Sequence, residues 1–206
     1  IEVRCAEDGH IDCERVGDSD LSAIAAYAAE KSIEISCLTS YYRDFVTQKR
    51  ESELSNLRRV VEIAVSLECR NVRLYGGTYP VQPGFNEDTA WRRTVSGIRE
   101  LADFASGADV RFCIETHIGS QTYTARDAVR MVEEVERDKV GILLDFAWVY
   151  LAAKEDAREA VQITFPYLFH CHYKDWVVSR IESASPEWNA CLMGYGNIPW
   201  KDLFHE

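Results

Sequence analysis

The sequence predicts an α/β fold built around one parallel sheet, because six short apolar runs alternate with longer amphipathic stretches. The apolar runs are rich in Val, Ile, Leu, Phe and Tyr, which is typical of strands that are covered on both faces. They span residues 1–5, 33–38, 72–75, 110–114, 140–144 and 168–172. The chain has 206 residues, of which 47% are hydrophobic, so we expect a single domain with one core over residues 1–206.

Apolar residues at helical spacing mark five helices between and after these runs. The patterns cover residues 21–28, 54–64, 95–102, 129–135 and 151–163. Asp20, Asp88 and Thr124 lie before three of these patterns, and we expect them to cap the helices. Residues 176–199 form the longest stretch without such a pattern and are expected to be a long loop.

An open doubly wound sheet and a closed (β/α)₈ barrel both account for this alternation. The first apolar run is followed by Ala6-Glu7-Asp8-Gly9, which lacks the glycines of the phosphate-binding loop in a doubly wound fold. Polar residues that could take part in catalysis follow several different runs, as they do at the strand ends of barrel enzymes. Both features favour the (β/α)₈, or TIM, barrel.

Charge and cysteine content argue against several classes of protein. A net charge of −11 argues against a nucleic-acid partner, because binding to DNA or RNA depends on neutralising phosphates. The apolar runs are too short to cross a bilayer, so we expect no membrane partner. The seven cysteines are odd in number, widely spaced and without a Cys-x-x-Cys pair, which is typical of neither a disulfide framework nor a zinc cluster. Free cysteines within apolar runs favour a reducing, cytoplasmic compartment.

Three apolar runs end in residues that could bind a metal ion: Glu115, Asp145 and His172. Glu115 and Asp145 are 30 residues apart, and Asp145 and His172 are 27 apart, about one strand–helix unit each. Successive strands of a barrel end at the same rim, so the three side chains should converge. A carboxylate directly after a buried strand needs compensation, because burying an unpaired charge is costly. A divalent ion would supply it, and this mixed ligand set suits Mn²⁺, Mg²⁺, Co²⁺ or Zn²⁺.

Simpler roles remain open for each of these residues. A single Asp or Glu at the end of a strand often caps the next helix or forms a salt bridge in a loop. His170 and His172 are two residues apart and therefore face the same side of their strand. One of the two is expected to be a packed or hydrogen-bonded core histidine.

Longer motifs around these residues resemble the xylose isomerase-like TIM barrels, a group of sugar-phosphate isomerases and epimerases. The most specific motifs are residues 114–117 (IETH), 141–147 (GILLDFA) and 166–175 (PYLFHCHYKD), followed by the Gly-x-Gly segment at 193–200 (MGYGNIPW). In that family a Glu, an Asp and the second His of a His-x-His-x-Lys-Asp stretch bind a divalent metal. The resemblance therefore implies Glu115, Asp145 and His172 as metal ligands, with His170 deeper in the barrel.

The chain also departs from the pattern of that family. A fourth ligand, a Glu on the last strand of the barrel, is expected beyond Glu206, and the first apolar run resembles the family's second strand. The resemblance thus implies an incomplete barrel of about six of eight strand–helix units, with the neighbouring first and last strands missing. We expect such a fragment to be poorly soluble and nearly inactive, and a version extended through the missing strands to be soluble and metal-dependent.

Trp148 stands where many relatives have a substrate-contacting His, so the identity of the substrate stays open.

The resemblance implies a sugar or sugar-phosphate isomerase or epimerase that transfers a proton through a metal-stabilised enediolate. Glu115 would act as the acid/base group, and His117, Trp148 and Lys174 would contact the substrate. A loop hydrogen bond for His117 and a surface salt bridge for Lys174 are equal alternatives to these substrate contacts.

Two other functions stay open: a lyase that dehydrates an inosose-type keto-polyol, and a barrel without activity. A DNA-repair endonuclease is disfavoured by the acidic charge and by only five histidines. The sequence leaves the sugar, the metal and the oligomeric state undecided.

Overall fold

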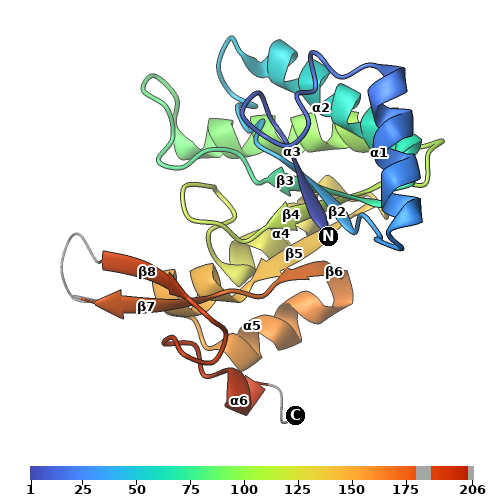
Figure 1. Cartoon of the computed structure of the whole chain (residues 1–206). Coiled ribbons are helices and arrows are strands. Elements are labelled where there is room, and N and C mark those ends of the chain that lie inside the picture. Colours follow the sequence, from blue (N-terminus) through green and yellow to red (C-terminus); the bar gives the residue numbers. More distant parts are fainter. Residues whose placement is uncertain (180–186, 204–206) are drawn as a thin grey trace.

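The computed structural model describes residues 1–179 and 187–203, and its centre is a sheet of six parallel strands (Figure 1). The strands pair in chain order, β1-β2-β3-β4-β5-β6. Their bounds are β1 Glu2–Cys5, β2 Cys37–Ser40, β3 Asn71–Tyr75, β4 Arg111–Glu115, β5 Val140–Asp145 and β6 Leu168–His172. A doubly wound sheet would reverse its strand order part-way, so the observed order confirms an incomplete (β/α)₈ barrel.

Helices connect the strands and cover the outer face of the sheet. They are α1 Asp18–Glu30, α2 Arg50–Ser66, α3 Glu87–Phe104, α4 Ala125–Val135, a π-helical segment η1 Ala147–Ala152, α5 Ala157–Thr164 and a 3₁₀ turn η2 Phe165–Tyr167. Neighbours in the chain pack on one another, α1 on α2, α2 on α3, α3 on α4 and α4 on α5. No helix in the described ranges combines the length and the apolar character that spanning a membrane requires.

Alternate strand residues give the half-barrel an apolar outer layer and a polar interior. The outward-facing residues of β3, β4 and β5 belong to the hydrophobic core beneath the helices: Val72, Leu74, Phe112, Ile114, Ile142 and Leu144. The buried residues that alternate with them include Arg73, Glu115 and Asp145. The buried charged side chains of β3, β4 and β5 therefore lie inside the half-barrel, on the face that the helices do not cover.

Two elements differ from the sequence prediction in extent. The second strand begins at Cys37 and not at residue 33, because Ile33 donates its N–H to the Ala28 carbonyl (2.9 Å) to end α1. The prediction of one helix at 151–163 was wrong, because this stretch divides between the end of η1 and the start of α5. The Asp156 side chain begins α5 by accepting a hydrogen bond from the Glu159 N–H (2.9 Å).

The predicted caps have mixed outcomes. Thr124 caps α4 as expected, with its side chain accepting a hydrogen bond from the Asp127 N–H (3.0 Å). Asp88 is wrong as a cap, because Asn86 begins α3 and accepts from the Thr89 N–H (2.8 Å). Asp20 lies in the first turn of α1, where its carboxylate accepts from the Gly17 N–H (3.0 Å).

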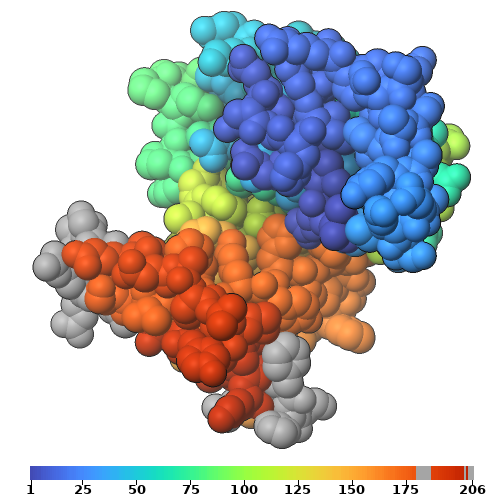
Figure 2. Space-filling model, viewed as in Figure 1, coloured from blue at the N-terminus to red at the C-terminus, as the bar shows by residue number. Residues whose placement is uncertain are grey.

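The prediction of an irregular loop at 176–199 was wrong, because this stretch contains most of an antiparallel hairpin. Strands β7 (Asp175–Ser179) and β8 (Glu187–Cys191) pair with each other, and the short helix α6 (Trp200–Leu203) follows. Residues 180–186 lie outside the described residues. In Figure 2 the orange and red segments from α5 to α6 form the lower part of the visible face, beneath the blue N-terminal segments.

Gly141, near the start of β5, allows β6 to pack closely against β5. A Cβ atom at this position would lie 2.5 Å from the Tyr167 carbonyl oxygen and 2.6 Å from the Phe169 ring. We expect Gly141→Ala to lower the free energy of unfolding by about 1–3 kcal/mol, because backbone atoms must move to relieve the clash. Urea unfolding measures the change. Gly107→Ala is the control, since no heavy atom lies within 4 Å of a Cβ there. Equal stability losses in the two variants would contradict the expectation.

Candidate metal centre

Glu115, Asp145 and His172 are the last residues of three neighbouring strands, β4, β5 and β6. One ligand atom from each residue lies within 4.8 Å of the other two. The His172 Nδ1 atom is 2.8 Å from Glu115 Oε1 and 3.4 Å from Asp145 Oδ2. The structure therefore brings the three predicted ligands together at one rim, with His172 facing the two carboxylates.

Asp145 is fully buried, and its two oxygen atoms have separate partners. The Oδ1 atom accepts hydrogen bonds from the N–H groups of Ala147 (3.0 Å) and Trp148 (3.4 Å), so Asp145 does cap the start of η1. The Oδ2 atom faces His172 and forms an ion pair with the Lys174 Nζ atom at 2.6 Å. Capping thus occupies one oxygen and leaves the other directed into the site.

Glu115 is also buried and is paired with a cation that the sequence analysis did not identify. The Arg73 Nε atom, on β3, lies 3.3 Å from Glu115 Oε2, and both side chains are almost completely buried. The Arg73 guanidinium lies over the rings of Tyr41 and Tyr75, 4.7 and 4.2 Å from their centroids. An arginine between two apolar residues of a predicted buried strand was the available signal, because such a charge requires a partner.

A second carboxylate missed by the sequence analysis, Glu2 on β1, holds the far side of the His172 ring. The His172 Nε2 atom lies 3.1 and 3.0 Å from the two oxygens of Glu2. A carboxylate on one ring nitrogen fixes the ring and directs the other nitrogen at the ligand position, as is common for metal-binding histidines. Glu2 also accepts a hydrogen bond from His170 Nε2 at 2.6 Å, so His170 does not face Glu115 and Asp145.

These contacts shift the pKa values of the central groups. Burial alone would raise the pKa of Glu115, but the hydrogen bond from His172 and the charge of Arg73 outweigh it and lower the pKa to about 2. Burial would lower the pKa of His172, but its contacts with Asp145, Glu115 and Glu2 raise it to about 11. The carboxylate of Glu115 is therefore ionised at neutral pH, and His172 is a cation between carboxylates.

The residues fit a divalent cation. Glu115 Oε2 and Asp145 Oδ2 are buried and have ion pairs but no hydrogen-bond partner in the described part of the chain. Glu115 Oε1 and the unbonded Asp145 Oδ2 both lie beside His172 Nδ1. Two carboxylates and one imidazole nitrogen form a ligand set that Mg²⁺, Mn²⁺, Co²⁺ and Zn²⁺ accept. Their service as metal ligands remains a prediction.

The three predicted substrate contacts lie together beside this centre. The Trp148 ring is 5.0 Å from the His117 ring, and the Lys174 Nζ atom is 4.4 Å from the Trp148 ring centroid. Lys174 is ion-paired with Asp145, and His117 Nδ1 contacts the carbonyl of Ile118, so each also has a local partner. Their roles toward a substrate stay predictions.

The hairpin adds aromatic residues that the sequence analysis did not identify. Trp176 on β7 and Trp188 on β8 pack against Trp148, with ring centroids 6.4 and 5.6 Å away. Their positions depend on the pairing of β7 with β8, and that hairpin was missed, so no local pattern pointed to them.

A family described as "Xylose isomerase-like TIM barrel" matches residues 1–206 of this chain. The chain belongs to that family. A solved structure of another xylose isomerase-like TIM barrel protein, from Mycobacterium smegmatis in complex with magnesium, superposes with a TM-score of 0.76 at 18% identity. The superposition covers 95% of this chain and 69% of that one, which shows a shared fold.

Two proteins similar to this chain are named D-psicose 3-epimerase. The protein from Ruminiclostridium cellulolyticum is 29% identical over 117 residues, and that from Agrobacterium fabrum is 27% identical over 117 residues. Each alignment covers 55% of this chain but only 35% and 36% of the relatives' own lengths. The chain therefore matches about a third of each epimerase.

Proposed function

We propose that this protein is a divalent-metal-dependent sugar or sugar-phosphate isomerase or epimerase. The observation that carries the proposal is the convergence of Glu115, Asp145 and His172 at the rim of the half-barrel, where the buried Asp145 Oδ2 atom lacks a hydrogen bond. Membership of the family and the similarity to two D-psicose 3-epimerases support the class of substrate.

The residues of this chain have distinct roles in the proposed reaction. Glu115, Asp145 and the Nδ1 atom of His172 would hold the ion, which supplies Lewis-acid stabilisation of negative charge on the substrate's oxygens. Glu115, ionised at neutral pH, would accept the proton from the carbon next to the carbonyl. Lys174 and His117 would bind substrate hydroxyl or phosphate oxygens, and Trp148 would form an apolar wall beside them.

Deuterium exchange tests this function directly. The purified protein is incubated in D₂O with free and phosphorylated ketohexoses, in the presence of Mg²⁺, Mn²⁺, Co²⁺ or Zn²⁺. An epimerase or isomerase returns a sugar that carries deuterium at the carbon next to the carbonyl, because the abstracted proton exchanges with solvent. A product lighter by one water would instead identify a lyase. Bound metal without exchange or turnover of any sugar would identify an inactive barrel and overturn the proposal.

Metal binding is expected to release about one proton per ion at pH 8, because the raised pKa of His172 keeps the metal-facing nitrogen protonated. A histidine with the usual pKa of 6.5 would already be neutral at that pH. Affinity should therefore rise with pH up to about 11, where His172 loses its proton without metal. Calorimetric titration in buffers of different ionisation enthalpy measures the number of protons. A binding heat independent of the buffer would contradict this expectation.

The same pKa values determine how pH affects the metal-free protein. The stabilising contribution of His172 is complete below its usual pKa of 6.5 and is lost as pH rises through about 11. That of Glu115 is complete above its usual pKa of 4.5 and is lost as pH falls through about 2. Both contributions are complete between those two usual pKa values, so the metal-free centre is most stable in mildly acidic solution.

A further inference from the structure

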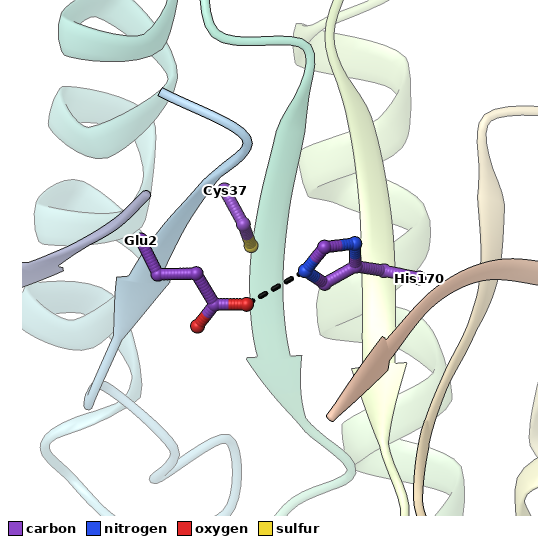
Figure 3. Close-up of side chains that lie close together, drawn as sticks. All are labelled: Glu2, Cys37 and His170. Atoms are coloured by element: carbon purple, nitrogen blue, oxygen red, sulfur yellow. Dashed lines mark hydrogen bonds and ion pairs between the residues drawn. The ribbon is translucent and has the colours of Figure 1, made fainter. Parts of the chain in front are cut away.

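A second group of metal-ligand types lies deeper in the half-barrel, below the candidate metal centre. It consists of Glu2 on β1, Cys37 on β2 and His170 on β6, and one ligand atom of each lies within 4.8 Å of the others (Figure 3). Glu2 and Cys37 are paired across β1 and β2, and His170 precedes His172 by two residues on β6. The three residues therefore face the same interior space from three strands.

A hydrogen bond accounts for two of these residues but not for the third. Glu2 Oε1 and His170 Nε2 are 2.6 Å apart and form an ordinary carboxylate–imidazole pair. The Cys37 side chain is fully buried, and its sulfur points toward that pair in Figure 3. The Cys37 Sγ atom donates a long hydrogen bond of 3.7 Å to the carbonyl of Leu38. A thiol packed only as a small hydrophobe has no need to face a carboxylate and an imidazole.

We propose that Glu2, Cys37 and His170 form a second metal site that takes Zn²⁺ or Co²⁺ in preference to Mg²⁺. One sulfur, one nitrogen and one oxygen ligand suit these ions, whereas Mg²⁺ prefers oxygen ligands alone. Three protein ligands leave the fourth tetrahedral position to water. The Glu2 and His170 side chains are 30% and 21% exposed, so water and the ion have access to the site.

The position of this site gives it a structural role. In the described sheet, β1 and β6 each have one neighbouring strand, yet Glu2 and His170 meet across the interior, 168 residues apart in the chain. An ion bound there would link β1 and β2 to β6 and restrain the two edges of the sheet. Glu2 also contacts Nε2 of His172, so the second site adjoins the proposed first one through a shared carboxylate.

Cobalt absorption distinguishes the two sites, because only the second one contains sulfur. Metal-free protein is titrated with Co²⁺, and we expect an intense sulfur-to-cobalt charge-transfer band in the near ultraviolet and about two bound ions per chain. Cys37→Ala should remove the band and lower the stoichiometry to about one. Asp145→Asn should instead keep the band and lose the other ion. Cys171→Ala is the matched control, because residue 171 alternates with His170 and His172 and faces away from the site.

Thermal unfolding provides a second measurement. A Zn²⁺ concentration about a hundredfold above the dissociation constant should raise the Tm of the wild type in saturating Mg²⁺ by about 5–10 °C. In Cys37→Ala, folded by circular dichroism, the increase with Zn²⁺ should be smaller, and what remains reflects Zn²⁺ replacing Mg²⁺ at the first centre. The proposal is overturned if the wild type shows no charge-transfer band, or if the band survives in Cys37→Ala. Neither result depends on catalytic activity, so failure of the proposed function would be seen separately in the exchange experiment.

Discussion

Glu115→Gln is expected to lower kcat/KM for the proposed proton transfer by about 10²–10⁴-fold, the usual contribution of a general base. Loss of the charge removes the base and also one of the three converging ligand groups, so the actual decrease should lie at or beyond the upper end. Turnover of the best keto-sugar and deuterium exchange measure the effect, with bound metal determined in the same samples. Loss of exchange at full metal occupancy would assign the effect to the missing base.

Glu159→Gln is the matched control for this substitution. Glu159 is a half-exposed carboxylate on α5, ion-paired with Arg126, and is not part of the centre. The Glu159→Gln variant should leave kcat/KM and metal content unchanged. Turnover by Glu115→Gln within tenfold of wild type would exclude Glu115 as the base, whatever its effect on metal affinity.

Arg73→Met is expected to lower the free energy of unfolding of the metal-free protein by about 3–5 kcal/mol, because it leaves the buried carboxylate of Glu115 without its cation. The pair is almost completely excluded from water, and the arginine also loses its contacts with the rings of Tyr41 and Tyr75. Urea unfolding in the presence of a chelator measures the loss. By contrast, Arg92→Met should change stability by less than about 0.5 kcal/mol, since the Arg92–Asp88 pair is mostly exposed.

A double-mutant cycle separates the charge effect from packing. Adding Glu115→Gln to Arg73→Met removes the unpaired charge, so the double variant should be more stable than Arg73→Met alone. Additive losses from the two substitutions would mean that Arg73 acts through its aromatic contacts and not by compensating Glu115.

The sequence by itself determined the strand order and the three residues at the centre. Each strand was recognisable from a short apolar run, and sequential strand–helix units in a barrel place their ends at one rim. Glu115 and Asp145 directly follow such runs and His172 ends one, so local position along the chain was enough to bring them together. The choice of His172 over His170 depended on the resemblance to the family, since their spacing alone places both on the same side of β6.

Only the tertiary structure decided what surrounds these three residues. Glu2 contacts His172 from 170 positions away, and Arg73 lies beside Glu115 from the neighbouring strand. The hairpin brings Trp176 and Trp188 to Trp148. Such contacts depend on strand register and on the curvature that brings β1 toward β6 across the interior, and no local pattern of apolar and polar residues encodes either. A short apolar run can show that a strand forms, but the side chains it meets are determined when the sheet curves around a shared interior.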